Sequence, residues 1–492
     1  MKMLRRLLTS LLLLVIVLSG ILAGHLALVW WSDPAAAPPA PEPGKEDVSR
    51  FSLANPARVV RVARTLPEAE AQLAGLVRQA RAEGGRIAIA GARHSMGGHT
   101  MADGAVVVDM TPLNFVDEPR QEGGAHFVTV GAGALWRDVL PRLQAAGLAV
   151  QIMQSNNDFT VGGSLSVNCH GWQHGLPPIA SSVVSLRVVT ADGGVAACDA
   201  HTNDELFRHV LGGYGLFGII TQATLRVVKD AHYKTKTVAV TPESYWKTFQ
   251  CETLDDSAGM AYGRINVAPL GFLESGTVNV LRLSGESPPK TRPAGFMPLL
   301  KRLVFRGSVG SGFGKQVREW GERLGGELDG GWRSVIQGEP ASDFGSRRTD
   351  STEILQEYFV PVRRLGEFIT RIRPLFEKHR PVDLLNITVR DVKPDETTAL
   401  PYAREHVFGL VMLFHMELGP ESDERMRAFS QDMIEEALAC GGTYYLTYRP
   451  HATREQFARA YPMAADFFET KRRLDPGNIF RNQFLEKYGP GK

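Results

Sequence analysis

One short stretch decides the fold: Gly91-Ala92-Arg93-His94-Ser95. It follows 86–90, in which isoleucines alternate with smaller or polar residues, a pattern that predicts a strand ending at Gly91. The loop after such a strand exposes backbone N–H groups at a sheet edge. In a glycine-containing turn these groups form a concave donor site that suits a pyrophosphate, and Gly97 and Gly98 are expected to permit its close approach.

Two more glycine-containing motifs follow about seventy residues later. They are Val161-Gly162-Gly163-Ser164 and His170-Gly171, and the first of them ends a stretch that is too rich in serine and asparagine to be core. Predicted strands and amphipathic helices alternate throughout this part of the chain. No Gly-x-Gly-x-x-Gly with an acidic residue about twenty positions on is found where it should be, so a nicotinamide domain has little support.

Together these motifs resemble the cofactor loops of the vanillyl-alcohol-oxidase flavoprotein superfamily, whose members have an FAD-binding domain of the para-cresol-methylhydroxylase (PCMH) type. The most similar branch is that of the alditol and sugar-lactone oxidases. The resemblance covers Val59 to Val228 and returns near the C-terminus, where 475–482 is similar to the family's closing signature. It implies that the cofactor is FAD, joined covalently through His94 to the 8α methyl of the isoalloxazine. From the residues alone, a hydrogen-bonded His94 beside a non-covalent flavin stays open.

The resemblance also implies a set of cofactor-binding residues, which line the flavin or its diphosphate in relatives. They are Gly91, Ala92, Arg93, His94, Ser95, Met96, Ser155, Gly162, Gly163, Ser164, His170, Gly171, Gly218, Ile220 and Asn482. An ordinary loop is the alternative for the serine- and asparagine-rich stretch.

Two later strands are expected to build the substrate pocket. The first, 354–361, resembles the Glu-Tyr-Phe-x-Pro strand of the alditol-oxidase branch. Because adjacent residues of a strand point to opposite faces, only one of Glu357 and Tyr358 can face the substrate. The sequence does not say which of the two does so.

On the second strand, relatives carry a Glu-x-Arg pair that polarises the substrate hydroxyl. The matching positions here are Asn386 and Thr388, with Arg390 one alternation further along the same face. This departure weakens the transfer of the alditol mechanism. Pairing with Asp391 or Asp395 at the strand end explains Arg390 as well as substrate contact does.

A candidate proton carrier lies near the C-terminus. The segment Tyr448-Arg449-Pro450-His451 resembles the Arg-Pro-His segment near the flavin in this branch. An unperturbed histidine titrates near neutrality, so His451 is expected to take the hydroxyl proton. The predicted catalytic residues are His451, Arg390, Glu357, Tyr358 and Asn386.

The expected fold class is α+β, with a two-subdomain PCMH-type FAD-binding domain, an α+β substrate (cap) domain and an N-terminal transmembrane helix. The expected boundaries are 1–33 for a membrane anchor or signal, 34–50 for a Pro/Ala-rich linker, 51–230 for the FAD-binding domain, 231–440 for the cap and 441–492 for a segment that returns to the FAD-binding domain.

The sequence of the N-terminus predicts targeting to a membrane. Three basic residues precede a run from Leu7 to Trp31 that has few polar side chains and is long enough to cross a bilayer as a helix. The charge balance on the two sides predicts a cytoplasmic N-terminus and an exported, periplasmic body. A signal peptide cleaved near Ala23 or Ala27 is the rival, and it would leave a secreted or periplasmic protein.

Composition narrows the partners. The chain has 492 residues, 43% of them hydrophobic, which is enough for two or three cores, and its net charge of +2 gives no electrostatic case for nucleic acid. A small-molecule substrate, the lipid bilayer, and oxygen or a quinone as electron acceptor are expected instead. The four cysteines are widely spaced, so free buried thiols are expected.

The predicted function is FAD-dependent oxidation of a CH–OH group of a polyol, sugar or sugar lactone, with hydride transfer to the flavin. A flavin-dependent reductase or desaturase of a lipid or polyprenyl-linked substrate is one alternative. The other is an exported metal-dependent hydrolase that uses His94, His99, His170 and His174, although glycines interrupt both histidine pairs and no ligand set is completed, so no metal is expected.

Overall fold

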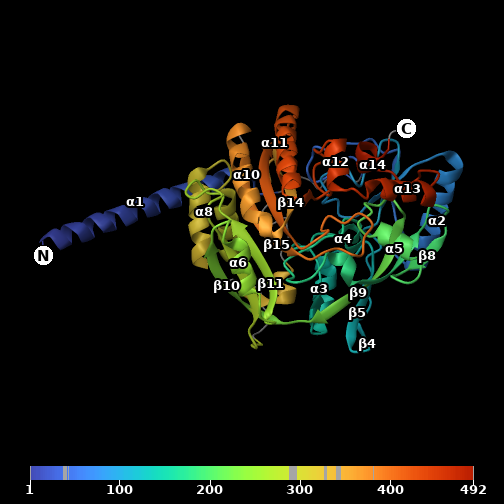
Figure 1. Cartoon of the computed structure of the whole chain (residues 1–492), viewed down its shortest axis with the longest axis horizontal. Coiled ribbons are helices and arrows are strands. Elements are labelled where there is room, and N and C mark those ends of the chain that lie inside the picture. Colours follow the sequence, from blue (N-terminus) through green and yellow to red (C-terminus); the bar gives the residue numbers. More distant parts are fainter. Residues whose placement is uncertain are drawn as a thin grey trace.

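The computed structural model describes residues 2–36, 42, 44–287, 296–325, 330–338, 345–380 and 382–490. This part of the chain is a mixed α/β protein with three sheets, from which one long N-terminal helix projects (Figure 1). Residues 37–41 and 43 of the predicted linker lie outside the described residues, as do 288–295 and 326–329 of the basic middle region.

A parallel sheet of three strands lies at the start of the body, in the order β1-β3-β2. Its members are β1 (Arg58–Arg61), β2 (Ile87–Ala90) and β3 (Val106–Asp109). Helix α2 (Leu66–Glu83) joins the first two strands and buries one face, which includes Leu73 and Val77. It begins after Thr65 and ends at Gly84 in the left-handed conformation, as its sequence predicts.

A six-stranded sheet follows, in the order β4-β5-β9-β7-β8 with β6 also paired to β9. The strands are β4 (Arg120–Glu122), β5 (Ala125–Gly131), β6 (Leu148–Val150), β7 (Val183–Val189), β8 (Val195–Cys198) and β9 (Ile219–Lys229). The helices of this part are α3 (Trp136–Ala145), α4 (Val161–Ser166), η1 (Ile179–Ser182) and α5 (Asp204–Val210).

The third sheet is antiparallel and has eight strands, in the order β13-β10-β12-β11-β15-β16-β14-β17. They are β10 (His232–Val240), β11 (Ala258–Ile265), β12 (Gly276–Leu283), β13 (Gly331–Trp332), β14 (Ser351–Pro361), β15 (Asp383–Val392), β16 (Val407–Glu417) and β17 (Thr443–Tyr444). The accompanying helices are α6 (Tyr245–Glu252), α7 (Phe296–Arg306), α8 (Gly312–Gly325), α9 (Arg333–Ile336), η4 (Val362–Arg364), α10 (Leu365–Lys378) and α11 (Pro420–Ala439).

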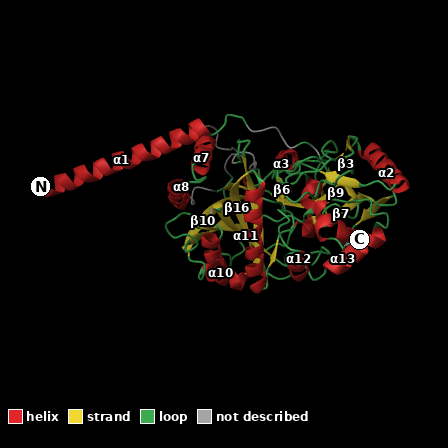
Figure 2. Cartoon of the chain, turned by 90° about the horizontal axis from the view of Figure 1, so that it is seen from above, coloured by secondary structure: helices red, strands yellow, loops and turns green. Residues whose placement is uncertain are grey.

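Helices α10 and α11 lie side by side against one face of this sheet (Figures 1 and 2). The register of the central strands fixes which side chains share a face, because directly paired residues point the same way. One row runs Tyr262, Arg390, Gly409, Phe359, and the next runs Arg264, Thr388, Val411, Glu357. We call the face that carries these two rows the open face, and the face under α10 and α11 the helix face.

The C-terminal segment carries α12 (Arg454–Ala460), α13 (Ala464–Leu474) and α14 (Gln483–Tyr488), and between α13 and α14 it returns to the first sheet. The backbone N–H of Ile87 donates to Ile479 O at 2.7 Å, and the N–H of Arg481 donates to Ile87 O at 2.9 Å. Asp475 accepts from the N–H groups of Ile479 and Phe480 at 2.9 Å and pairs with buried Lys471. This Asp-Pro-Gly-Asn turn therefore anchors the chain end.

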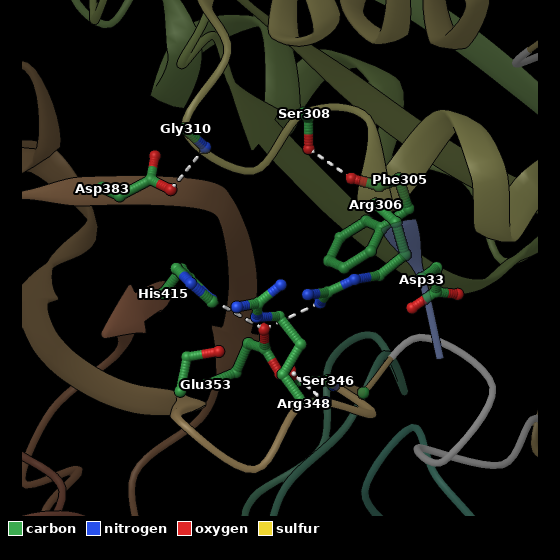
Figure 3. A network of polar contacts seen from close by, with 12 residues as sticks. Asp33, Phe305, Arg306, Ser308, Gly310, Ser346, Arg348, Glu353, Asp383 and His415 are labelled. Atoms are coloured by element: carbon green, nitrogen blue, oxygen red, sulfur yellow. Dashed lines mark hydrogen bonds and ion pairs between the residues drawn. The ribbon is translucent and has the colours of Figure 1, made fainter. Parts of the chain in front are cut away.

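Helix α1 (Lys2–Ser32) is attached to the third sheet through α7. Arg302 of α7 binds both carboxylate oxygens of Asp33, at 2.7 and 3.0 Å. Glu353 of β14 accepts from Arg306 at 2.7 Å and lies 3.0 Å from His415 Nδ1 (Figure 3). These contacts hold the base of α1 against the body.

Among the residues with described positions, no helix is both long enough and apolar enough to pass through a bilayer. The transmembrane anchor therefore stays a prediction. All four cysteines are free, and three are buried as expected, but Cys251 is exposed because it lies on the outer side of α6.

Candidate functional site

The predicted cofactor loop, 91–96, follows β2 and is held against the C-terminal segment and β14. The N–H of Met96 donates to Thr447 O at 2.9 Å, and Leu355 N lies 3.2 Å from Met96 Sδ. Arg93 has a φ of 61°, which turns the chain sharply at this point. The loop thus meets the strand that carries Glu357.

The structure corrects the expected role of Gly97 and Gly98. A Cβ at Gly97 would lie 2.7 Å from Tyr448 O, and one at Gly98 would lie 2.0 Å from Gln483 Oε1. The chain's own C-terminal segment therefore packs against the side of both glycines on which a Cβ would project. Gly97 is needed because the backbone of Tyr448 packs closely there, and Gly98 because of its positive φ and the side chain of Gln483.

His94 is partly buried, and its ring centroid lies 4.3 Å from that of Phe159. Burial lowers the pKa of His94 below its ordinary value, although the charge and the backbone of Asp158 oppose the shift. The imidazole is consequently neutral at neutral pH. A neutral ring has one nitrogen with an available lone pair, which is the form that bond formation to carbon requires.

The second motif forms α4, a short helix that is capped by Thr160, whose Oγ1 accepts from Gly163 N at 3.3 Å. Gly162 N donates to Ala132 O at 2.8 Å. The hydroxyl of Ser164 accepts from Trp136 Nε1 at 2.9 Å and is buried. Its partners show that Ser164 points into the core of the domain.

The remaining cofactor candidates occupy two places. Ile220 lies on β9, where it is buried and pairs with Val188 of β7, and Gly218 directly precedes β9. Asn482 lies further off, where its Nδ2 donates to Tyr214 O at 2.7 Å and to His99 O at 3.0 Å. The Oδ1 of Asn482 also caps α14. Asn482 therefore fastens the C-terminal segment to the first domain.

His170 and Glu357 meet across the two halves of the molecule. His170 Nε2 lies 2.8 Å from Glu357 Oε1, and Glu357 is 2% exposed. The rings of Phe359, Tyr402 and Tyr445 lie around the imidazole, with centroid distances of 5.5 to 5.9 Å. This contact settles which residue of the pair on β14 uses the open face: it is Glu357.

Two glycines make room for this contact. A Cβ at Gly171 would lie 2.0 Å from Met153 O, so the turn after His170 requires glycine. A Cβ at Gly409, on the neighbouring strand, would lie 2.7 Å from Glu357 Oε1. Gly409 therefore leaves the space into which the carboxylate of Glu357 projects.

Arg390 lies on the same open face and is 8% exposed. Its Nη2 donates to Ser155 Oγ at 3.0 Å, and its guanidinium lies 5.2 Å from the centroid of Trp172. Burial lowers the pKa of Arg390 to about 10, while the charge of Glu357 opposes the shift. Ser155 is thus a partner of Arg390.

The expected alternative for Arg390, an ion pair with Asp391 or Asp395, is wrong. Asp391 points to the opposite face of β15, where its carboxylate lies 2.7 Å from His174 Nδ1 and also contacts His406. Asp395 accepts from Asn168 Nδ2 at 2.8 Å. Both carboxylates are therefore engaged elsewhere.

Asn386, Thr388 and Arg390 share one face, as the alternation predicts. Asn386 accepts from Arg264 Nη1 at 2.8 Å and donates to Thr388 Oγ1 at 2.9 Å. Arg264 was not identified from the sequence. Its alternation with Tyr262 on β11 is the signal that could have found it, because both lie opposite predicted site residues of β15.

Tyr358 and His451 do not join this cluster, which corrects their expected roles. Tyr358 is on the helix face, where it packs against Phe368 of α10 with a centroid distance of 6.1 Å. His451 Nδ1 lies 3.0 Å from Ser430 Oγ and 3.2 Å from Gln356 Nε2. Since Gln356 and Glu357 are adjacent strand residues, the sheet separates His451 from Glu357.

His451 belongs to a closed network on the helix face. Its Nε2 lies 3.3 Å from Asp423 Oδ1, and Arg449 Nη2 donates to both carboxylate oxygens of Asp423, at 3.0 and 3.1 Å. Burial lowers the pKa of His451, although the hydrogen bond to Asp423 opposes the shift. The histidine is therefore held as a neutral structural group.

The four histidines of the hydrolase alternative lie apart and have other neighbours. His94 lies beside Phe159, His99 stacks against Phe484, His170 contacts Glu357 and His174 contacts Asp391. Within the described ranges, no three His, Cys, Asp or Glu side chains converge as they would around a metal ion. The arrangement therefore gives the hydrolase alternative no support.

The residues on these segments fit FAD. Several buried polar atoms have no hydrogen-bond partner in the described part of the chain, and they lie on the cofactor loop or face it across the open face. They are Arg93 Nε, Ser95 Oγ, His170 Nδ1, Trp172 Nε1 and Arg390 Nη1. Buried polar atoms are normally paired, and the ring carbonyls, ring nitrogens and phosphates of FAD supply matching acceptors.

Comparison with known proteins agrees with this fit. Residues 63–199 match the family model of an FAD binding domain. The chain is 26% identical to L-gulono-1,4-lactone dehydrogenase of Mycobacterium tuberculosis over 86% of this chain and 94% of that protein. It is 23% identical to L-gulonolactone oxidase of Bos taurus over 83% of this chain and 90% of that protein.

A second group of relatives matches a shorter region. Cytokinin dehydrogenase 1 of Oryza sativa is 35% identical over 198 residues, which are 39% of this chain and 36% of that protein. The chain thus spans about a third of the length of the cytokinin dehydrogenases that it matches. The matches confirm the predicted cofactor, FAD, and the predicted resemblance: the chain has an FAD binding domain and resembles FAD-dependent oxidoreductases of the vanillyl-alcohol-oxidase superfamily near the sugar-lactone branch.

Proposed function

We propose that the protein oxidises a CH–OH group of a sugar-derived substrate, a polyol, sugar or sugar lactone, to a carbonyl. The observation that carries the proposal is the contact between His170 and Glu357 on the open face, next to the cofactor loop. When bound, FAD supplies the hydride acceptor that such an oxidation needs. The residues of this chain supply orientation and the proton acceptor.

Glu357 is the proposed proton acceptor. Its carboxylate is buried, and its Oε1 is held 2.8 Å from His170 Nε2, so its position is fixed before substrate binds. Gly409 keeps the space beside it open. His170 is the proposed positioning residue for Glu357, because the aromatic rings around it fix the plane of the imidazole.

Arg390, Asn386 and Thr388 are proposed to bind substrate oxygens. Arg390 has an unpaired Nη1 within the described structure, and the amide and hydroxyl lie on the same strand and face. This set replaces the Glu-x-Arg pair of the alditol branch. A guanidinium, an amide and a hydroxyl together offer both donors and acceptors to a polyhydroxy compound.

We also propose that His94 carries the flavin covalently. The neutral, partly buried imidazole supports this proposal, and it stands in the loop between Phe159 and β14. His94→Ala tests it. The wild-type protein should keep its yellow colour in an acid-precipitated pellet, whereas the variant should release it or bind none.

The extent of the matches favours a sugar-derived substrate over a cytokinin. The gulonolactone relatives align with the cap as well as the FAD-binding domain, whereas the cytokinin dehydrogenases align with 39% of the chain or less. The cap carries Glu357 and Arg390, so only the longer matches include the residues that are proposed to contact the substrate. The electron acceptor is proposed to be oxygen or a quinone.

Turnover of the purified full-length protein tests the proposed function. A panel of polyols, aldoses and aldonolactones should reduce an artificial electron acceptor, and a cytokinin-like secondary amine should not. Turnover of the amine alone would assign a C–N oxidation and contradict the proposal. Tyr358→Phe is the matched control, since it alters the same strand on the helix face and should keep wild-type turnover.

A further inference from the structure

Arg390 is a buried cation whose positive charge no carboxylate of the described structure contacts directly. Its Nη2 donates to the neutral hydroxyl of Ser155, and its guanidinium lies over the ring of Trp172. Nη1 has no partner within the described ranges. A buried guanidinium is costly without a counter-charge, so this side chain is suited to an anion.

The nearby acid does not supply that anion. Glu357 Oε1 lies 2.8 Å from His170 Nε2, and although the charge of Glu357 raises the pKa of Arg390, no ion pair joins the two side chains within the described part of the chain. Asp391, the next residue, projects to the other face and contacts His174 and His406. The guanidinium fork is therefore available on its Nη1 side.

The surroundings of Arg390 strengthen this view. Arg264 lies one row along on the adjacent strand, and the repulsion between the two cations contributes, after burial, to the lowered pKa of Arg390. Trp172 and Tyr262 stack with a centroid distance of 4.5 Å and an interplanar angle of 22°. Arg264 already has a carboxylate partner, Glu322, at 3.6 Å, so Arg390 is the cation beside this aromatic pair that suits a molecule with both an anionic group and the apolar C–H face of a sugar.

We propose that the substrate carries a carboxylate, held by the fork of Arg390, so that the enzyme oxidises a hydroxy acid of the sugar-acid class in preference to a neutral lactone. This inference rests on the proposed function. In the reaction the carbinol C–H bond breaks with its electron pair going to FAD, the O–H bond breaks with its proton going to Glu357, and a C=O bond forms. The carboxylate itself is unchanged.

The first test measures binding without oxidation. α-Hydroxyisobutyrate has no hydrogen on its carbinol carbon, so it can occupy the site and cannot be oxidised, and its amide is a neutral isostere. Each is titrated into the full-length flavoprotein while the visible flavin band is followed. The carboxylate should bind about tenfold to a hundredfold more tightly than the amide, the range expected for a charge-assisted contact.

Variants locate the effect. Arg390→Gln should abolish the preference for the carboxylate, and Arg390→Lys should keep part of it, because the charge remains while the fork is lost. Tyr358→Phe should keep the full preference. If Arg390→Gln does not fold, the Arg390→Lys protein and the wild-type comparison of acid with amide still decide the question.

The second test compares turnover of an aldonate with that of its lactone. The inference predicts a higher kcat/KM for the aldonate and a selective loss of that advantage in Arg390→Gln. Equal binding of acid and amide, or an equal loss for charged and neutral donors, would overturn it. Failure of every CH–OH donor to reduce the flavin would instead overturn the proposed function, and the binding titration would still report on Arg390.

Discussion

Both faces of β14 bury polar groups, but the two faces differ in how these groups are paired. On the helix face, the ring nitrogens of His451 and the carboxylate of Asp423 are paired with each other, with Ser430 and with Arg449, although Arg449 Nε and the Tyr358 hydroxyl have no partner in the described structure. On the open face, His170 Nδ1 and Arg390 Nη1 have no partner in the described structure. The two clusters are separated by one strand, because they approach it from Gln356 and Glu357 respectively.

This contrast separates a structural cluster from a functional one. A buried polar group is expensive unless it is paired, so a satisfied network stabilises the fold, whereas unsatisfied donors persist where a ligand completes them. A histidine in an Arg-Pro-His segment looked catalytic from its sequence neighbours. Its partners in the structure show that it belongs to the satisfied cluster.

The largest expected effect on turnover comes from removing the carboxylate of Glu357 on the open face. Glu357→Gln keeps the shape and removes the proton acceptor, so kcat should fall by roughly 100- to 10,000-fold, the usual contribution of a general base. The melting temperature should stay near the wild-type value. Steady-state kinetics and thermal unfolding measure the two effects, and wild-type turnover in Glu357→Gln would remove this residue from the mechanism.

Breaking the helix face should affect stability instead of turnover. Asp423→Asn removes the charge that pairs with Arg449 and that lies 3.3 Å from the neutral ring of His451, which should lower the free energy of unfolding by about 2–3 kcal/mol. The kcat of the folded protein should be unchanged. Denaturant unfolding at neutral pH measures the loss, and a kcat that falls as far as in Glu357→Gln would contradict the separation of the two faces.

The same carboxylate gives a pH dependence with a definite sign. Burial opposes ionisation of Asp423, but the hydrogen bonds and charges of His451 and Arg449 outweigh it and hold the pKa of Asp423 well below its usual range. Its stabilising effect is present at neutral pH and is lost as the pH falls below about 4, where the unfolded chain takes up the proton first. The difference in the free energy of unfolding between the wild-type protein and Asp423→Asn should therefore become smaller as the pH falls below about 4.

Gly409→Ala sharpens the comparison within the open face. The added Cβ would lie 2.7 Å from Glu357 Oε1 and 2.8 Å from Phe359, so the carboxylate must move. We expect a loss of about 1–3 kcal/mol in stability, the usual effect of overpacking, together with a clear fall in kcat. Gly75→Ala in α2 is the control, because its Cβ meets open space: kcat should stay at the wild-type value, and stability should rise by up to about 1 kcal/mol, the usual gain at a helix-interior glycine.

The smallest expected effect is that of Ser155→Ala. The variant removes one hydrogen bond to Arg390 while leaving the guanidinium over Trp172. The KM for substrate should rise by about threefold to tenfold, in line with one lost hydrogen bond, and kcat should change less. A fall in kcat with an unchanged KM would place Ser155 on the cofactor side of the site.

Much of the first domain could be predicted from the sequence, because its signals are local. The strand before Gly91, the helix that ends at Gly84 and the Asp-Pro-Gly-Asn turn all depend on neighbouring residues. The alternation on β14 predicted that Glu357 and Tyr358 must divide the two faces. These features need no knowledge of distant contacts.

The remainder depends on the order of strands in the third sheet. Arg264 and Arg390 become neighbours because β11 pairs with β15, although more than a hundred residues separate them in the chain. The contact of His170 with Glu357 likewise joins two halves of the molecule. Gly97 shows the converse, since a glycine that looked suited to a ligand faces the backbone of Tyr448. No local pattern reports such long-range packing.

Anaerobic reduction of the bound flavin tests the central claim, that the open face is where the substrate is oxidised. Wild-type and Tyr358→Phe proteins are mixed with a sugar-derived donor without oxygen, and the loss of the visible flavin band is timed. We predict rapid bleaching in both proteins and a rate lower by roughly two orders of magnitude or more in Glu357→Gln. Bleaching of Glu357→Gln at the wild-type rate, or loss of bleaching in Tyr358→Phe alone, would contradict the account.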